Sequence, residues 1–245
     1  MNYALILAAG VGQRMRNGGL PKQFLKLNGK PIIIYTLEKF DQMEEISKIV
    51  ISCHGDYLDY MQDLLQFYQI KKVAGIVVGG ADRQASLLRG LDEVKGLSQD
   101  PENDIVVIHD GVRPLVSRMT IAENIRIAIQ CGCAVTVHPV TESVVVTASD
   151  EIEMDAFKKR ADTYTLTSPQ TFRINAVIKA FQSSCMHSEE KGIPLLDAAM
   201  VYASEGGSVH MVKEQNMNLK VTTPEDFYIL RSMLELEENK FIFGL

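Results

Sequence analysis

The stretch Tyr3-Ala-Leu-Ile-Leu-Ala-Ala-Gly-Val-Gly-Gln-Arg14 decides the fold. It begins with an uninterrupted apolar run, which is typical of a strand buried on both faces of a parallel sheet. The run ends in glycines and an arginine, and glycines at that place let backbone N–H groups approach a phosphate closely. The stretch therefore predicts an α/β protein whose first strand, Tyr3–Ala8, leads into an anion-binding loop.

The same alternation continues along the first half of the chain. Apolar runs of strand length alternate with segments that have helical spacing. The predicted strands are Ile46–Ser52, Gly75–Val78, Ile105–His109 and Ala134–Pro139, and the predicted helices are Ile32–Phe40, Tyr57–Tyr68, Arg83–Glu93 and Thr120–Gln130. This βαβ order predicts a doubly wound, mainly parallel sheet with right-handed crossovers.

The alternation breaks after Pro139. Ser143–Thr147 and Ile152–Phe157 read as two strands of a hairpin around a turn at Ala148–Glu151. Because an isolated hairpin is only marginally stable, it must lie on its own domain or on a partner subunit. The predicted elements after it are Asn175–Cys185, Leu196–Ser204 and Pro224–Leu236 as helices and Ser208–Lys213 as a strand. We expect one domain over residues 1–245, with an arm inserted at about 139–160.

Composition excludes several classes of protein. The net charge of −6 leaves no bulk electrostatic footprint for nucleic acid, so local cations must meet any phosphate ligand. No apolar run is long enough for a membrane span, and the N-terminus lacks the features of a signal peptide. The cysteines are Cys53, Cys131, Cys133 and Cys185. No second pair or nearby histidine completes a zinc site around Cys131-Gly-Cys133, so free thiols and a cytoplasmic location are expected.

The first loop has the ingredients of a phosphate site without a standard motif. Position 15 is Met, so the loop is not Gly-x-Gly-x-x-Gly, and no Gly-Lys-Ser/Thr follows; this disfavours a dehydrogenase and a P-loop enzyme. Arg14 and Lys22 supply positive charge, and Pro21 stiffens the chain beside Lys22. The alternative is a plain turn with two solvated cations.

Later loops carry further candidate residues. In Gly79-Gly80-Ala-Asp-Arg83-Gln-Ala-Ser86, backbone groups and Ser86 could read a nucleobase edge, although Asp82 or Gly80 could simply cap the following helix. Asp110 ends a predicted strand, where it could bind Mg²⁺ or a ribose hydroxyl, or pair with Arg113. Lys220 lies in a short predicted strand, and burying a lysine is costly unless it meets an anion.

Together these residues resemble one enzyme family over nearly the whole chain. The motifs, in order, are Ala8–Met15, Pro21–Gln23, Gly79–Arg83, His109–Pro114, Ser168–Gln170 and Lys220–Asp226. They are similar to cytidylyltransferases that act on 2-C-methyl-D-erythritol 4-phosphate and to the related ribitol 5-phosphate cytidylyltransferases. The resemblance implies a Rossmann-like nucleotidyltransferase core with a mixed, mostly parallel sheet, and a homodimer whose hairpin arms interlock.

The resemblance also implies a reaction and a set of site residues. CTP and a polyol phosphate would give a CDP-polyol and pyrophosphate with Mg²⁺. Arg14, Lys22 and Lys220 would be catalytic, and Asp110 would sit at the ribose or the metal. The implied CTP-binding residues are Ala8, Ala9, Gly10, Gly12, Gly79, Gly80, Arg83, Ser86 and Asp110. The implied polyol-phosphate-binding residues are Arg113, Ser143, Arg160 and Asp197, with Arg160 reaching the partner subunit's substrate.

Departures from the family pattern bear on the polyol. The isoprenoid enzymes usually have Asp-Thr where this chain has Glu142-Ser143, and Thr where it has Leu196. Val112 and the longer spacing from Arg14 to Lys22 are closer to the ribitol enzymes. We therefore expect ribitol 5-phosphate or a similar pentitol phosphate, with methylerythritol phosphate as the alternative. A transferase for another nucleotide and a non-catalytic nucleotide-binding protein on the same fold are the remaining hypotheses.

Overall fold

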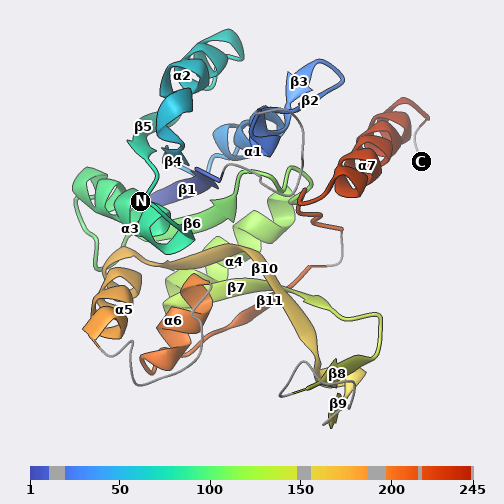
Figure 1. The fold of residues 1–245 in the computed structure, drawn as a ribbon. Coiled ribbons are helices and arrows are strands. Elements are labelled where there is room, and N and C mark those ends of the chain that lie inside the picture. Colours follow the sequence, from blue (N-terminus) through green and yellow to red (C-terminus); the bar gives the residue numbers. More distant parts are fainter. Residues whose placement is uncertain (11–19, 148–155, 187–196, 215–216, 244–245) are drawn as a thin grey trace.

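The computed structural model describes residues 1–10, 20–147, 156–186, 197–214 and 217–243. Its main sheet has the strand order β11-β7-β10-β6-β1-β4-β5 (Figure 1). Neighbouring strands are parallel except around β10, which runs antiparallel to β6 and to β7. The strands are β1 (Asn2–Ala8), β4 (Lys48–Cys53), β5 (Val73–Val78), β6 (Ile105–Asp110), β7 (Cys133–Pro139), β10 (Tyr164–Arg173) and β11 (Met211–Lys213). The predicted mixed, mostly parallel sheet is confirmed.

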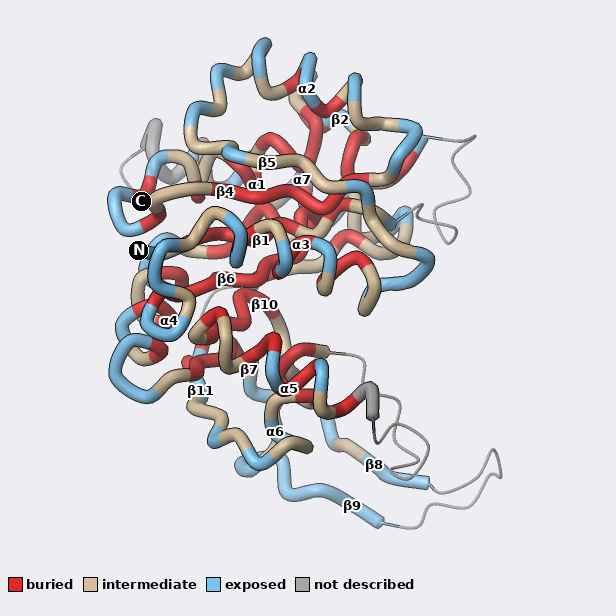
Figure 2. The backbone as a smooth tube through the Cα atoms, turned by 90° about the vertical axis from the view of Figure 1, so that its left-hand side faces the viewer, coloured by how far each residue is buried: buried red, intermediate tan, exposed pale blue. Residues whose placement is uncertain are grey.

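Helices cover both faces of this sheet. One face carries α1 (Ile32–Asp41), α2 (Leu58–Phe67) and α4 (Arg118–Cys131), and the other carries α3 (Arg83–Leu97), α5 (Ile174–Met186) and α6 (Ala198–Ser204). Alternate residues of β1 serve the two cores, because successive side chains of a strand point to opposite faces. Ala4 and Ile6 pack into the first core, and Tyr3 and Leu5 into the second. Figure 2 shows this buried centre.

A third apolar cluster fixes the C-terminal segment. Helix α7 (Pro224–Phe243) packs through Leu230 and Leu234 near the small sheet of β2 (Lys26–Leu27) and β3 (Lys30–Pro31). Val221 and Val112 belong to the same cluster, and the Val221 N–H donates to the Val112 carbonyl at 3.0 Å. Lys220 is thereby held beside the loop that follows β6.

Two short strands form a separate antiparallel pair. They are β8 (Val144–Val146) and β9 (Ala156–Lys158), and Figure 1 places them away from the main sheet. Val145, Val146 and Phe157 are exposed on this pair, and Figure 2 shows β9 in the colour of exposed residues. The predicted turn, and the start of the predicted second strand at Ile152, lie outside the described residues.

The remaining differences from expectation are local. The sequence analysis did not predict β10, the long antiparallel strand between β6 and β7. Helix α3 continues to Leu97, and the strand expected over Ser208–Lys213 is only Met211–Lys213. In the part of the chain that the structure describes, no helix is both long and apolar enough to span a bilayer.

Candidate active site

A cleft of about 470 Å³ opens where β1 and β6 end and where the loop after β5 begins. Parallel strands bring their carboxyl ends to one edge of a sheet, which is where ligands bind in open α/β folds. The lining residues are Leu7, Ala8, Ala9, Gly10, Lys22, Gln23, His54, Gly80, Ala81, Asp82, Arg83, Ser86, Asp110, Val112 and Lys220.

The loop between β5 and α3 is built for close backbone contact. The Gly79 N–H donates to the Cys53 carbonyl at 2.7 Å, and a Cβ on Gly79 would lie 2.2 Å from the Cβ of Ala9. Only glycine fits there, so this loop lies directly against the loop after β1. Asp82 caps α3 by accepting from the Ala85 N–H at 2.7 Å, which confirms the capping alternative for that residue.

The Ser86 hydroxyl stabilises this loop as a hydrogen-bond acceptor and as a donor. Its Oγ accepts from the Gly80 N–H at 3.0 Å and donates to the Asp82 carbonyl at 2.7 Å. The side chain is buried, although it belongs to the cleft wall. The geometry therefore assigns Ser86 to holding Gly80 in place, and leaves backbone groups of the loop to face a ligand.

Three cations converge on the buried carboxylate of Asp110. Arg83 Nη1 lies 2.7 Å from Oδ1, and Arg113 Nε and Lys220 Nζ lie 3.1 Å and 3.0 Å from Oδ2. Burial alone would raise the pKa of Asp110, but the charges of Arg83, Lys220 and Arg113 hold it well below its usual range. Three cations thus face Asp110, and Asp197 pairs with one of them, so the cluster keeps a positive surplus that suits an anionic ligand.

Arg83 connects this cluster to the segment before α6. Its Nη2 donates to Asp197 Oδ1 at 3.2 Å, while its Nη1 pairs with Asp110. Asp197 was expected at the polyol phosphate, and the structure places it beside the cleft rather than in its lining. The Asp110–Arg113 pair, considered as an alternative in the sequence analysis, is present together with the other two.

A buried histidine holds the loop after β6. His109 lies behind Asp110, with Nε2 3.1 Å from the Arg113 carbonyl and Nδ1 3.1 Å from Ser168 Oγ. Burial lowers the pKa of His109 to about 4, so the ring is neutral. Since the carbonyl needs a donor, Nε2 carries the hydrogen and Nδ1 accepts from Ser168, whose Oγ accepts in turn from the Asp110 N–H at 3.2 Å.

The structure brings most predicted residues together. Ala8, Ala9, Gly10, Lys22, Gly80, Arg83, Ser86, Asp110 and Lys220 line the cleft, and Gly79 supports it. Gly12 and Arg14 lie outside the described residues. Arg113 pairs with Asp110 but lines a neighbouring cavity. Ser143 and Arg160 are exposed near the β8–β9 pair and are absent from the lining of the cleft within the described chain.

Sequence reasoning missed the residues that organise the site from behind. Gln23 is 1% exposed, and its Nε2 donates to the Ala8 and Gly10 carbonyls at 2.7 Å and 3.1 Å. It thereby ties the turn that carries Lys22 to the end of β1. Its place in Pro21-Lys22-Gln23 was a usable signal, as was the place of Ser168 in Ser168-Pro-Gln170, whereas nothing in the sequence pointed to His54.

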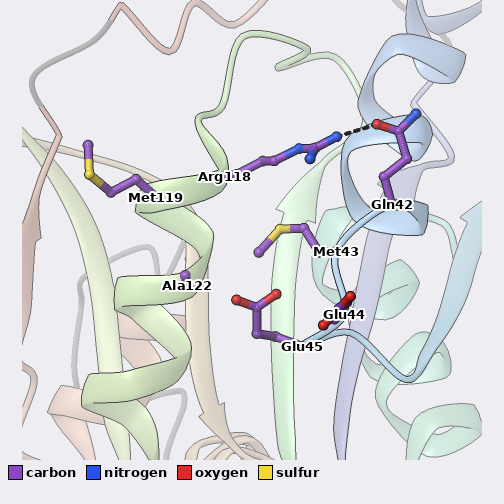
Figure 3. Close-up of a pocket in the computed structure, with 7 residues that line it drawn as sticks. All are labelled: Gln42, Met43, Glu44, Glu45, Arg118, Met119 and Ala122. Atoms are coloured by element: carbon purple, nitrogen blue, oxygen red, sulfur yellow. Dashed lines mark hydrogen bonds between the residues drawn. The ribbon is translucent and has the colours of Figure 1, made fainter.

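A larger depression of about 760 Å³ lies elsewhere, between the end of α1 and the start of α4 (Figure 3). Its lining is Gln42, Met43, Glu44, Glu45, Arg118, Met119 and Ala122. It shares no lining residue with the cleft in the described chain, and Glu44 and Glu45 make it unsuitable for a phosphate. By size alone this depression would be the better candidate for the ligand site, but the clustered cations and the nearby strand ends favour the smaller cleft.

The fold and the site define a nucleotide-binding α/β enzyme, because glycine loops and clustered cations meet at the carboxyl edge of a mostly parallel sheet. The family model for 2-C-methyl-D-erythritol 4-phosphate cytidylyltransferase, IspD, matches residues 3–235. The chain belongs to this family and is a CTP-dependent nucleotidyltransferase.

Curated relatives match over the full length. The chain is 34% identical over 246 residues to a ribitol-5-phosphate cytidylyltransferase of Streptococcus agalactiae, and 35% identical over 244 residues to one of Vibrio parahaemolyticus. Both matches cover 100% of each chain. A 4-diphosphocytidyl-2C-methyl-D-erythritol synthase from Anaerococcus prevotii shares the fold, with a TM-score of 0.80, 23% identity and 96% coverage of each chain.

Proposed function

We propose that this enzyme transfers CMP from CTP to ribitol 5-phosphate, giving CDP-ribitol and pyrophosphate. The observation that carries the choice of polyol is the likeness, over the whole chain, to relatives named ribitol-5-phosphate cytidylyltransferases. Leu196 and Val112 support the same choice, since both depart from the usual isoprenoid pattern. A pentitol phosphate of similar shape falls under the same proposal.

We expect CTP to bind in the cleft in one orientation. The loop that begins at Gly79 would face cytosine with its backbone groups, and Asp110 would sit near the ribose. Lys22 and Lys220 line the same cleft and would face the triphosphate. Arg14 would join them from the first loop. In this orientation the α-phosphate would lie near Lys220, at the edge of the cation cluster.

The reaction then needs positioning and charge neutralisation more than acid–base chemistry. A phosphate oxygen of the polyol phosphate attacks the α-phosphorus of CTP in line, and the bond to the β-phosphate oxygen breaks as pyrophosphate leaves. A phosphate monoester is already anionic near neutral pH, so no general base is required. Lys220, together with Lys22, Arg14 and Mg²⁺, would offset the repulsion between the two anionic substrates.

Mg²⁺ would bind here mainly through the substrate phosphates, because both oxygens of Asp110 are already paired with cations. Among the described residues there is no cluster of three or more acidic, histidine or cysteine side chains that could hold a metal ion. Mg²⁺ is often bound by one or two carboxylates, with phosphate oxygens and water completing the shell. Asp110 would supply the one carboxylate, and the ion would neutralise part of the triphosphate charge when bound.

The exposed β8–β9 pair supports a homodimer. A two-stranded unit is marginal alone, and this one exposes Val145, Val146 and Phe157. We expect a second copy to cover it, with Arg160 reaching the polyol phosphate in the partner's cleft. Cys53 and Cys133 are buried free thiols, in keeping with the cytoplasm as the proposed compartment.

Pyrophosphate release tests the function. Purified enzyme receives CTP and Mg²⁺ with ribitol 5-phosphate or 2-C-methyl-D-erythritol 4-phosphate in parallel, and UTP replaces CTP in matched reactions. We expect strong preference for CTP with ribitol 5-phosphate. Preference for methylerythritol phosphate would move the enzyme to isoprenoid synthesis, and preference for UTP would overturn the nucleotide. CTP binding without release from either polyol would favour a non-catalytic nucleotide-binding protein.

A further inference from the structure

Asn218 links Arg113 of the cation cluster to β10. Its carbonyl accepts from Arg113 Nη1 at 2.8 Å, and its Nδ2 donates to the Ser168 carbonyl at 2.6 Å. Lys220 follows two residues later, so the same short segment carries one cation and anchors another. Asn218 is buried, and it lines a cavity of about 220 Å³ together with Arg113 and Lys220.

Two buried oxygens in this region have no hydrogen-bond donor among the described residues. Glu214 is 3% exposed; its Oε1 accepts from Thr120 Oγ1 at 3.1 Å, but its Oε2 has no partner in the described chain. The same holds for the Oδ1 of Asn218. The Asn218 amide cannot simply be turned over, because Oδ1 would then face the Ser168 carbonyl. Within the described residues, two acceptors therefore lack a donor in side chains that line the same cavity.

A proton on Glu214 would give both oxygens a partner, since Oε2 would then donate and Asn218 Oδ1 would accept. Burial raises the pKa of Glu214, although its contacts with Asn218, Thr120 and the Ser117 backbone, and its electrostatic interaction with His138, act in the opposite direction. His138 Nδ1 lies 3.0 Å from the Glu214 carbonyl, and Arg113 and Lys220 line the same cavity. These groups favour the ionised form, and burial outweighs the contacts that oppose it.

We propose that Glu214 is a carboxylic acid in the folded protein and that its hydroxyl donates to Asn218 Oδ1. Glu214 and Asn218 are then positioning residues: the bond fixes the Asn218 amide, and Asn218 fixes Arg113 and the segment that carries Lys220. The kinetic consequence of this inference rests on the proposed function, whereas the protonation of Glu214 can be tested without it.

The proton is measured directly by NMR. Wild-type enzyme is labelled with ¹³C at the glutamate side-chain carboxyl carbon, and its spectrum at neutral pH is compared with that of Glu214→Gln. We expect the resonance that the substitution removes to have the chemical shift of a protonated acid. If the missing resonance is that of a carboxylate, the proposal is overturned.

Kinetics test the positioning role. The Glu214→Gln side chain keeps a donor for Asn218 and an acceptor for Thr120, so this variant should keep kcat within about twofold of wild type. Glu214→Ala removes the donor, and we expect kcat to fall about tenfold or more with a smaller change in KM for CTP, because small misplacements of reacting groups are costly. A fall in Glu214→Gln as deep as in Glu214→Ala, or no fall in Glu214→Ala, would contradict this role.

Two further variants separate positioning from general damage. Thr171→Val removes another buried oxygen that has no partner in the described chain, from β10 and away from this cavity, and should leave kcat unchanged. Asn218→Asp keeps the shape of the side chain but loses the donor to Ser168, so it should lower kcat even if Glu214→Ala does not fold. If wild type transfers CMP to neither polyol phosphate, the proposed function fails, while the NMR comparison still decides the proton.

Discussion

The ammonium group of Lys220 lies 3.0 Å from the Asp110 carboxylate, although the two residues come from opposite halves of the chain. The hydrogen bond from Val221 to Val112 and the apolar cluster under α7 bring them together. Arg83 and Arg113 reach the same carboxylate, so the cluster carries more positive than negative charge. A chain with a net charge of −6 thus concentrates cations at one edge of its sheet.

Removing Lys22 or Lys220 should mainly slow the chemical step. We expect Lys22→Ala and Lys220→Ala each to lower kcat by a factor of about 10²–10³, the order found when one charge-stabilising donor is lost. Steady-state pyrophosphate release measures this. Lys26→Ala is the control, because Lys26 is an exposed lysine on β2 outside the cleft. A drop of less than about threefold in both variants would contradict the assignment.

Asp110 should contribute stability at neutral pH that acid removes. Its folded pKa is depressed, so the contribution is complete above the unfolded value near 3.8 and is lost as the pH falls through the lower folded value. Asp110→Asn should lower the free energy of unfolding by about 3 kcal/mol at neutral pH, since three cations lose the carboxylate that they share. Urea unfolding from neutral pH down to about pH 2 measures both effects.

The comparison variant for this prediction is Asp63→Asn, on the exposed side of α2. It should leave the free energy of unfolding within about 0.5 kcal/mol of wild type, as most surface substitutions do. If Asp110→Asn were as stable as Asp63→Asn at neutral pH, the ion pairs of Asp110 would make no net contribution to the stability of the fold.

The parallel strands could be predicted because a strand that is buried on both faces has a nearly continuous apolar sequence. The runs that became β1, β4 and β6 are nearly all apolar, and helices with regular spacing separate them. The sequence of β10 has no such apolar run. It contains Thr165, Ser168 and Gln170 and is interrupted by Pro169, a residue that usually argues against a central strand. Its register shifts between Leu166 and Gln170, which makes room for that interruption.

The site residues that could be predicted are charged residues, because their type and their place in the sequence already suggest ligand binding. Lys22, Asp110 and Lys220 are charged residues at strand ends or in loops, and they lie together in the cleft. The residues that hold them were not predictable in the same way. Whether His109 or Asn218 contacts a ligand or the backbone depends on distances between segments far apart in the chain, which periodicity does not give.

Gly79 should tolerate no side chain. A Cβ there would lie 2.2 Å from the Ala9 Cβ and 3.1 Å from Ser86 Oγ, so Gly79→Ala must push apart the two loops that form the cleft. We expect a loss of about 1–3 kcal/mol in stability, the usual cost of overpacking, and at least tenfold weaker CTP binding by calorimetry.

Gly96→Ala is the control for Gly79→Ala, and we expect it to raise stability rather than lower it. Gly96 lies in α3, where a Cβ would meet nothing within 4 Å among the described residues, so alanine should stabilise the helix by about 0.5–1 kcal/mol and leave CTP binding unchanged. Equal effects of the two substitutions on CTP binding would mean that the contact between Gly79 and Ala9 does not shape the cleft.

Phe157 should hold two copies of the chain together. It is 71% exposed on β9, and Val145 and Val146 of the paired strand are exposed as well. We expect wild type to sediment as a dimer and Phe157→Ser to shift it toward monomer, with lower transferase activity because Arg160 no longer reaches a partner's cleft. Phe67→Ser is the matched control, since Phe67 is 77% exposed at the end of α2. A Phe157→Ser protein that remains a fully active dimer would show that this face of the β8–β9 pair is not the contact between subunits.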